Sequence, residues 1–222
     1  MNFIKFITVF FFASVLLTSC EIEPVDSSLL PDNGGGTGGG TTTGDYWPTA
    51  INNQWIFKMD GVLQDPMKMI SINTISANTY YTFNQMVGTG LGLTVSGVQR
   101  LRKLNGDYYL KIENLSSPAQ GPIPGFTITG YETIMLKDYL PVGGTWTDKY
   151  SQTTTYTDPI FPVITLDFDI IATVMEKNSS ITIAGHNYTD VIKIKYIQKV
   201  TMVGQTTTVT SYYWYSKNVG PI

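Results

Sequence analysis

The feature that most constrains the fold is a strict alternation of apolar and polar side chains in the second half of the chain. The apolar residues occupy every even position of one segment: Ile164, Leu166, Phe168, Ile170, Ala172 and Val174. Asp167 and Asp169 stand between them, so the acids point to the opposite face of an extended strand. This period does not match an amphipathic helix, and it predicts a β-strand with one buried face.

Shorter segments repeat the pattern between turn residues. Asn105-Gly106 separates two alternating runs, and both residues tolerate the positive φ that a type I′ turn requires. A two-residue turn at this point pairs Leu104 with Asp107. The same register places Arg102 opposite Tyr109, where a cation–π contact can form. The sequence therefore predicts a β-hairpin with a defined register.

Residues 45–222 show such segments throughout and no long window of helical periodicity. Residues 117–125 contain three prolines, so they are not expected to join a ladder, and a turn is expected at residues 178–180. Short connections require antiparallel neighbours. We therefore predict one all-β domain, an antiparallel curved sheet of roughly ten strands that forms a sandwich, a barrel or a half-barrel. Periodicity alone leaves these three alternatives open.

The first nineteen residues have the features of a secretory signal peptide. Lys5 provides the positive charge, and the apolar run from Phe6 to Leu17 is too short to span a membrane as a helix. Cys20 is the only cysteine of the chain. The sequence Leu17-Thr18-Ser19-Cys20 resembles the lipobox of bacterial lipoproteins, which implies cleavage before Cys20 and acylation of that residue. The alternative is a free or disulfide-forming cysteine, but the chain has no second cysteine to pair with it.

Residues 20–44 are expected to form a flexible tether between the lipidated cysteine and the domain, because acids, glycines and threonines bury too little apolar surface to order the chain. Glu21, Glu23 and Asp26 resemble the surface-export signal of Bacteroidetes lipoproteins. The resemblance implies an outer-membrane protein at the cell surface rather than on the periplasmic face. The alternative is a solvated linker without a sorting role.

Composition and motifs argue against several classes of function. Removal of Lys5 with the signal peptide changes the net charge from −3 to −4, and no basic stripe is present, so nucleic acid is not an expected partner. His186 is the only histidine and lacks the motif of a catalytic triad or a zinc site. Asp167 and Asp169 could be compared with glycosidase carboxylates, but acids two residues apart are typical of a solvated strand face. We expect no enzyme activity, no metal and no cofactor.

The most suggestive group for binding is the run Tyr212, Tyr213, Trp214 and Tyr215 near the end of the chain. Aromatic faces can stack on sugars or line an apolar pocket. The alternative is that one side of the strand packs on the core and the other is covered by a loop or a partner chain.

Four segments resemble an uncharacterised family of Bacteroidetes outer-membrane lipoproteins: DYWPTAINNQWIFK, LPVGGTW, ITIAGHNYTDVIKI and YYWYSKNVGPI. Members of that family typically read Tyr-x-Pro, then Gly-Asn-x-Trp, near the domain start, and Lys-Gly-Val-Gly near the end. Asn52 stands in place of the usual glycine, and Asn218 in place of another. Family members usually continue with a further strand, whereas this sequence ends at Ile222. The resemblance brings no known activity.

Together these features predict a non-enzymatic lipoprotein of the cell envelope that binds a glycan, a lipid or a partner protein on the outer membrane, held there by its N-terminal lipid. The alternative is a structural or assembly subunit of an envelope complex.

Overall fold

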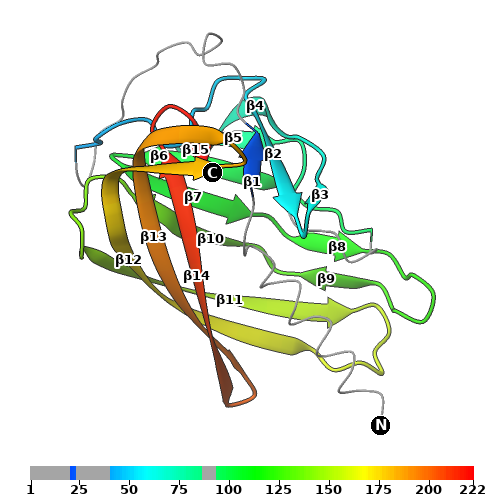
Figure 1. Cartoon of the computed structure of the whole chain (residues 1–222). Helices are drawn as coiled ribbons and strands as arrows, with labels where there is room; N and C mark the ends of the chain where they lie inside the picture. The colour runs from blue at the N-terminus through cyan, green and yellow to red at the C-terminus, as the bar shows by residue number, and fades with distance from the viewer. Residues whose placement is uncertain (1–20, 24–40, 87–93) are drawn as a thin grey trace.

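The structure is a computed structural model that describes residues 21–23, 41–86 and 94–222. Every regular element in these residues is a β-strand, which confirms the all-β prediction. The strands form two curled antiparallel sheets, and each sheet is a half-barrel (Figure 1). The predicted signal peptide and Cys20 lie outside the described residues.

The first sheet has eight strands in the order β1-β2-β4-β5-β6-β7-β10, with β3 beside β2. Their bounds are β1 Glu21–Glu23, β2 Gln54–Met59, β3 Val62–Leu63, β4 Met67–Ile75, β5 Asn78–Phe83, β6 Gln99–Leu104, β7 Asp107–Ile112 and β10 Tyr131–Lys137. The second sheet has seven strands in the order β15-β14-β13-β12-β11-β9-β8. Their bounds are β8 Leu115–Ser117, β9 Phe126–Ile128, β11 Thr145–Tyr156, β12 Ile164–Ile183, β13 His186–Met202, β14 Gln205–Ser216 and β15 Gly220–Pro221.

Ten of these strands have six or more residues, as the sequence pattern predicts, and the other five have only two or three. The five short strands could not be predicted from the sequence, because two or three residues do not establish a period. β8 stops at Ser117, and no strand occupies residues 118–125, where the prolines lie.

Five hairpins in the described residues turn through two residues that both have positive φ. These turns are Asp60-Gly61, Ser76-Ala77, Asn105-Gly106, Ala184-Gly185 and Val203-Gly204. Positive φ at both positions is the type I′ geometry, whose twist matches that of the strands it joins. The predicted hairpin at Asn105-Gly106 is confirmed, since Leu104 pairs with Asp107 and Arg102 lies opposite Tyr109. The Arg102 guanidinium carbon lies 3.7 Å from the centre of the Tyr109 ring.

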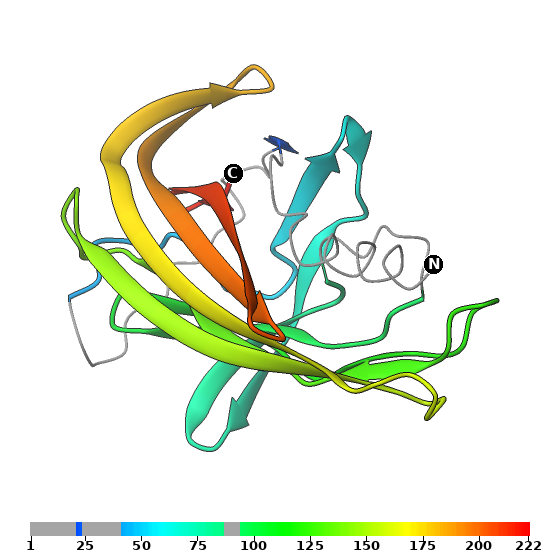
Figure 2. The ribbon, with the colours of Figure 1, turned by 90° about the horizontal axis from the view of Figure 1, so that it is seen from below.

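The turn predicted at residues 178–180 is wrong, because β12 continues through these residues to Ile183. Asn178 has a φ of 54°, and the register between β12 and β13 shifts between Glu176 and Ser179. These are the marks of a β-bulge, which bends a strand without ending it. Figure 2 shows β12 and β13 as a continuous arch at this side of the molecule.

The two sheets meet where β10 passes close to β11. β10 has a bulge between Ile134 and Leu136, so the backbone groups of Ile134 need partners outside the ladder. The Ile134 carbonyl accepts hydrogen bonds from the Tyr196 hydroxyl at 2.5 Å and from the indole N–H of Trp146 at 3.3 Å. The Ile134 N–H donates to the Asp148 carboxylate at 2.9 Å. Side chains of the second sheet therefore complete the hydrogen bonding of the first.

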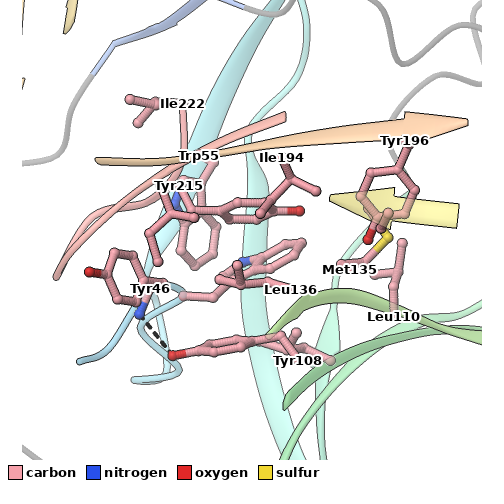
Figure 3. Close-up of a cluster of buried hydrophobic side chains, with 14 of the residues drawn as sticks. Tyr46, Trp55, Tyr108, Leu110, Met135, Leu136, Ile194, Tyr196, Tyr215 and Ile222 are labelled. Atoms are coloured by element: carbon pink, nitrogen blue, oxygen red, sulfur yellow. Dashed lines mark hydrogen bonds between the residues drawn. The ribbon is translucent and has the colours of Figure 1, made fainter. Parts of the chain in front are cut away.

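The core fills the space between the sheets. Figure 3 shows side chains from both sheets in one cluster, with Tyr215, Ile194 and Tyr196 facing Leu136 and Met135. The predicted inward face of β12 is confirmed for Phe168, Ile170, Ala172 and Val174, which are buried. Ile164 and Leu166 are only half-buried, and Phe168 lies outside the main cluster. The densest packing is therefore around Ile170, Ala172 and Val174.

The start of the domain is fixed to a buried carboxylate. Asp138 accepts hydrogen bonds from the Thr42 hydroxyl at 2.5 Å and from the Thr43 N–H at 3.1 Å. The Tyr108 hydroxyl accepts a hydrogen bond from the Tyr46 N–H at 2.9 Å (Figure 3). Burial raises the pKa of Asp138, and the hydrogen bonds from Thr42 and Thr43 oppose that rise. The tether predicted over residues 20–44 is therefore attached to the domain at both ends, because Glu21–Glu23 pair with β2 as β1, and Thr42 and Thr43 bond to Asp138.

Candidate functional site

The four aromatic residues predicted to bind a ligand lie on β14, and the strand divides them between its two faces. Tyr215 is 1% exposed and packs in the core, with its ring 5.9 Å from that of Trp47. Tyr213 points to the same side, where its ring meets that of Tyr196 edge-on at 5.0 Å. On the other side of the strand, Tyr212 is exposed and Trp214 is half-buried. Only this second pair is placed to contact a ligand at the surface.

Tyr212 and Trp214 form a surface group with Lys193 and Glu176, which we call the outer aromatic patch. Tyr212 is 41% exposed, and its ring lies 6.3 Å from that of Trp214 at an angle of 39°. Lys193 lies opposite Trp214 on the neighbouring strand β13. Its ammonium group is 5.4 Å from the Trp214 ring and 5.6 Å from the Tyr212 ring. The same group donates to the Glu176 carboxylate at 3.1 Å.

The side chains of the outer aromatic patch have polar groups that are available to bind a ligand. No hydrogen-bond partner is found within the described part of the chain for the Trp214 indole N–H or the Tyr212 hydroxyl. The Glu176 carboxylate can accept further hydrogen bonds, and Lys193 has two more N–H donors. The Lys193 ammonium is within cation–π distance of both rings. The patch thus combines two aromatic rings with hydrogen-bond donors and acceptors on neighbouring strands.

A second aromatic group joins the two sheets, with Tyr131 on β10 of the first sheet and Tyr150 and Phe168 on β11 and β12 of the second. Tyr131 stacks on Tyr150 at 4.2 Å, and Tyr150 stacks on Phe168 at 4.6 Å. Burial raises the pKa of the Tyr131 hydroxyl to about 12. Gln198 donates to the Tyr150 hydroxyl at 3.3 Å. The rings cover one another's faces, so this stack serves packing between β10, β11 and β12 rather than ligand binding. Sequence reasoning missed it because the three residues are far apart in the chain.

The first sheet carries a hollow of about 570 Å³ where β7 ends and β10 begins. Lys111, Glu113 and Glu132 line it. Glu113 pairs with Arg100 at 2.9 Å, and Glu132 pairs with Arg102 at 2.7 Å. These charges neutralise one another, and the hollow offers no aromatic pair comparable to the outer aromatic patch.

His186 and the two acids weighed for catalysis lie at opposite ends of the ladder between β12 and β13. His186 is exposed at the start of β13, directly after the turn Ala184-Gly185. Asp167 bonds to Ser151 at 2.6 Å, and Asp169 pairs with Lys149, both on the outer face of the second sheet. The described residues contain no group of three His, Cys, Asp or Glu side chains that could hold a metal ion. Among them there is also no helix long and apolar enough to cross a membrane.

Comparison with known proteins gave no match to a family model, to a curated protein or to a solved structure.

Proposed function

We propose that this protein is a lipid-anchored, non-enzymatic binding module of the outer membrane, and that its ligand is a glycan held on the outer aromatic patch. The observation that carries the proposal is the outward pair Tyr212 and Trp214, with Lys193 and Glu176 beside it. Burying aromatic side chains is the ordinary use of such residues in a β-domain. Two adjacent aromatic rings left at the surface, with free polar groups around them, are typical of a recognition surface.

The chemistry of the patch fits a sugar better than an acyl chain. The apolar C–H face of a sugar ring can pack on an aromatic face, while its hydroxyls need donors and acceptors at the rim. Lys193 and Glu176 supply both kinds of group. An acyl chain would instead need an enclosed apolar pocket. The exposed position of Tyr212 makes this an open surface, suited to a polysaccharide that continues beyond the site.

In this proposal the membrane anchor is Cys20, because a lipobox-like sequence precedes it. Two or three acyl chains on one cysteine would hold the protein firmly, since each buried CH₂ contributes about 0.8 kcal/mol. Glu21–Glu23 follow this cysteine directly and pair with β2 as strand β1, so the anchor would hold the first sheet close to the membrane surface.

The experiment is a glycan-array screen of the detergent-solubilised lipoprotein, followed by titration of any bound glycan. Trp214→Ala should weaken binding at least about tenfold, since aromatic anchors dominate the energy of such surfaces. Ile72→Ala is the matched control, because Ile72 is also an exposed apolar residue but lies on β4 of the other sheet. Binding that survives Trp214→Ala, or that fails equally in Ile72→Ala, would contradict the proposal.

A further inference from the structure

A second lysine, Lys195, lies on the side of the sheet that carries the outer aromatic patch. It is directly opposite Tyr212 in the ladder between β13 and β14, just as Lys193 is opposite Trp214. Residues that oppose each other in an antiparallel ladder point to the same face, with Cβ atoms about 4.5–5.5 Å apart. Lys195 is half-buried. Its side chain therefore lies next to the exposed ring of Tyr212.

The acids on this side of the sheet are already paired with other lysines. Thr173, and not an acid, lies opposite Lys195 on β12. Glu176 bonds to Lys193 at 3.1 Å, and Asp169 bonds to a lysine of β11 at 2.5 Å. Within the part of the chain that the structure describes, Lys195 has no ion pair, hydrogen bond or ring contact through its side chain. Lys195 is thus an uncompensated positive charge beside an aromatic ring.

Thr173, Lys195 and Tyr212 form one row across three strands, and each contributes a hydrogen-bond donor. Elsewhere on this side of the sheet, polar neighbours on adjacent strands bond to each other, as Thr201 and Thr206 do at 2.8 Å. Among the described residues, no side-chain hydrogen bond joins the three members of the row. The row is therefore a set of donors around one positive charge, which suits the oxygens of a carboxylate or a sulfate.

We infer that the glycan held on the outer aromatic patch is acidic, and that Lys195 binds its carboxylate or sulfate group. This inference rests on the proposed function, because Tyr212 and Trp214 hold the sugar ring. The charged group of an acidic sugar lies at the edge of its ring. A ring stacked on Tyr212 can therefore direct that group toward Lys195 and the hydroxyl of Thr173. A neutral sugar would leave the charge of Lys195 unpaired.

The balance of charge supports an acidic ligand. Glu176 bonds to Lys193, whose ammonium lies within 5.6 Å of both rings. Together with Lys195 these side chains make two positive charges and one negative, so one positive charge remains at the patch. Salt screens exposed charges over about 8 Å at physiological ionic strength. The selection therefore acts on a charged group held next to Tyr212, and not on the total charge of the polymer.

Matched pairs of oligosaccharides test this inference on the detergent-solubilised lipoprotein. One set contains galacturonate, glucuronate and mannuronate oligosaccharides, each beside its carboxyl-reduced neutral form. The other set contains sulfated oligosaccharides, each beside its desulfated form, so the two sets distinguish a carboxylate from a sulfate. Wild type should bind the acidic member of a pair about tenfold more tightly, the effect of one hydrogen bond to a charged group. Lys195→Gln should remove this preference, and Lys195→Arg should keep it because the charge remains.

Lys199→Gln is the matched control. It removes the same charge from the same strand and face, but Lys199 lies opposite Thr208, about 13 Å from Lys195 by the rise per residue of a strand. The acidic preference should survive this change. A preference that survives Lys195→Gln, or that Lys199→Gln removes equally, would overturn the inference.

Equal affinity of wild type for the acidic and neutral members of every pair would also overturn the inference. If Trp214→Ala then lost both members, the glycan proposal itself would stand. Failure of wild type to bind any probe would contradict both the inference and the glycan proposal.

Discussion

At the scale of single residues, Gly106 is constrained both by its backbone and by its neighbours. Its φ is 86°, and a Cβ atom there would lie 2.5 Å from the Asp138 carboxylate and 2.8 Å from the Tyr139 ring. Gly204 has a similar φ of 76°, but nothing lies within 4 Å. We expect Gly204→Ala to cost about 1 kcal/mol through backbone strain, and Gly106→Ala to cost clearly more. Urea unfolding of both variants measures the difference. Equal losses of unfolding free energy in the two variants would mean that Asp138 and Tyr139 move aside without an energetic cost, which would contradict this expectation.

The buried carboxylate of Asp138 should give a distinctive dependence of stability on pH. Burial raises its pKa in the folded state above the unfolded value near 3.9. Between the two values the folded state binds more protons, so this residue lowers the free energy of unfolding as the pH rises from about 4. Asp138→Asn removes that contribution. Urea unfolding at several pH values should show wild type losing stability relative to Asp138→Asn across this window. A relative gain would contradict the pKa direction.

Cys20 should be the membrane anchor, which the sequence predicts from the apolar segment, the small residues before it and the absence of a second cysteine. Cys20→Ser should remove the acyl chains and release a folded protein into the soluble fraction or the medium. Fractionation followed by immunoblotting detects this change. Retention of Cys20→Ser in the membrane would rule out the anchor. Changing Glu21 and Glu23 to Ala is the control, since it should leave lipidation intact and alter only access to added protease on whole cells.

At the scale of elements, the alternation of β12 from Asp167 to Val174 agrees with the structure. Phe168 is buried, while Asp167 and Asp169 lie on the outer face. Phe168→Ala should lower the free energy of unfolding by about 3–5 kcal/mol, through lost transfer energy and a cavity. Asp167→Asn and Asp169→Asn should change it far less, because both acids reach solvent. A loss for either acid as large as that for Phe168→Ala would contradict the assignment of faces.

The hairpin at Asn105-Gly106 could be predicted to the residue because one turn type fixes the register of both strands. The bulge at Asn178 could not be predicted in this way. A segment of Asn and Ser has the composition of a turn, and only the long ladder between β12 and β13 keeps it extended. The same limit applies to β14, where four adjacent aromatic residues looked like one cluster. Alternation assigns them to two faces, but it does not say which face meets the core.

At the scale of the whole molecule, periodicity left sandwich, barrel and half-barrel open, because all three share the same alternating strands. The choice depends on long-range contacts such as those of Ile134 with Tyr196 and Asp148. No local pattern marks these contacts, since their partners lie far apart in the chain. The glycan site depends on the same architecture, because curling the second sheet around the core leaves the outer faces of β13 and β14 at the surface.

The most direct test of the proposed site uses the fluorescence of tryptophan. The chain has four tryptophans. Trp47, Trp55 and Trp146 are buried, and only Trp214 lies at the outer aromatic patch. Quenching by acrylamide should therefore report mainly on Trp214. As a bound oligosaccharide saturates the protein, this quenching should fall, and Trp214→Phe should abolish the change. A glycan that binds, as measured by calorimetry, without altering the quenching of Trp214 would contradict the account.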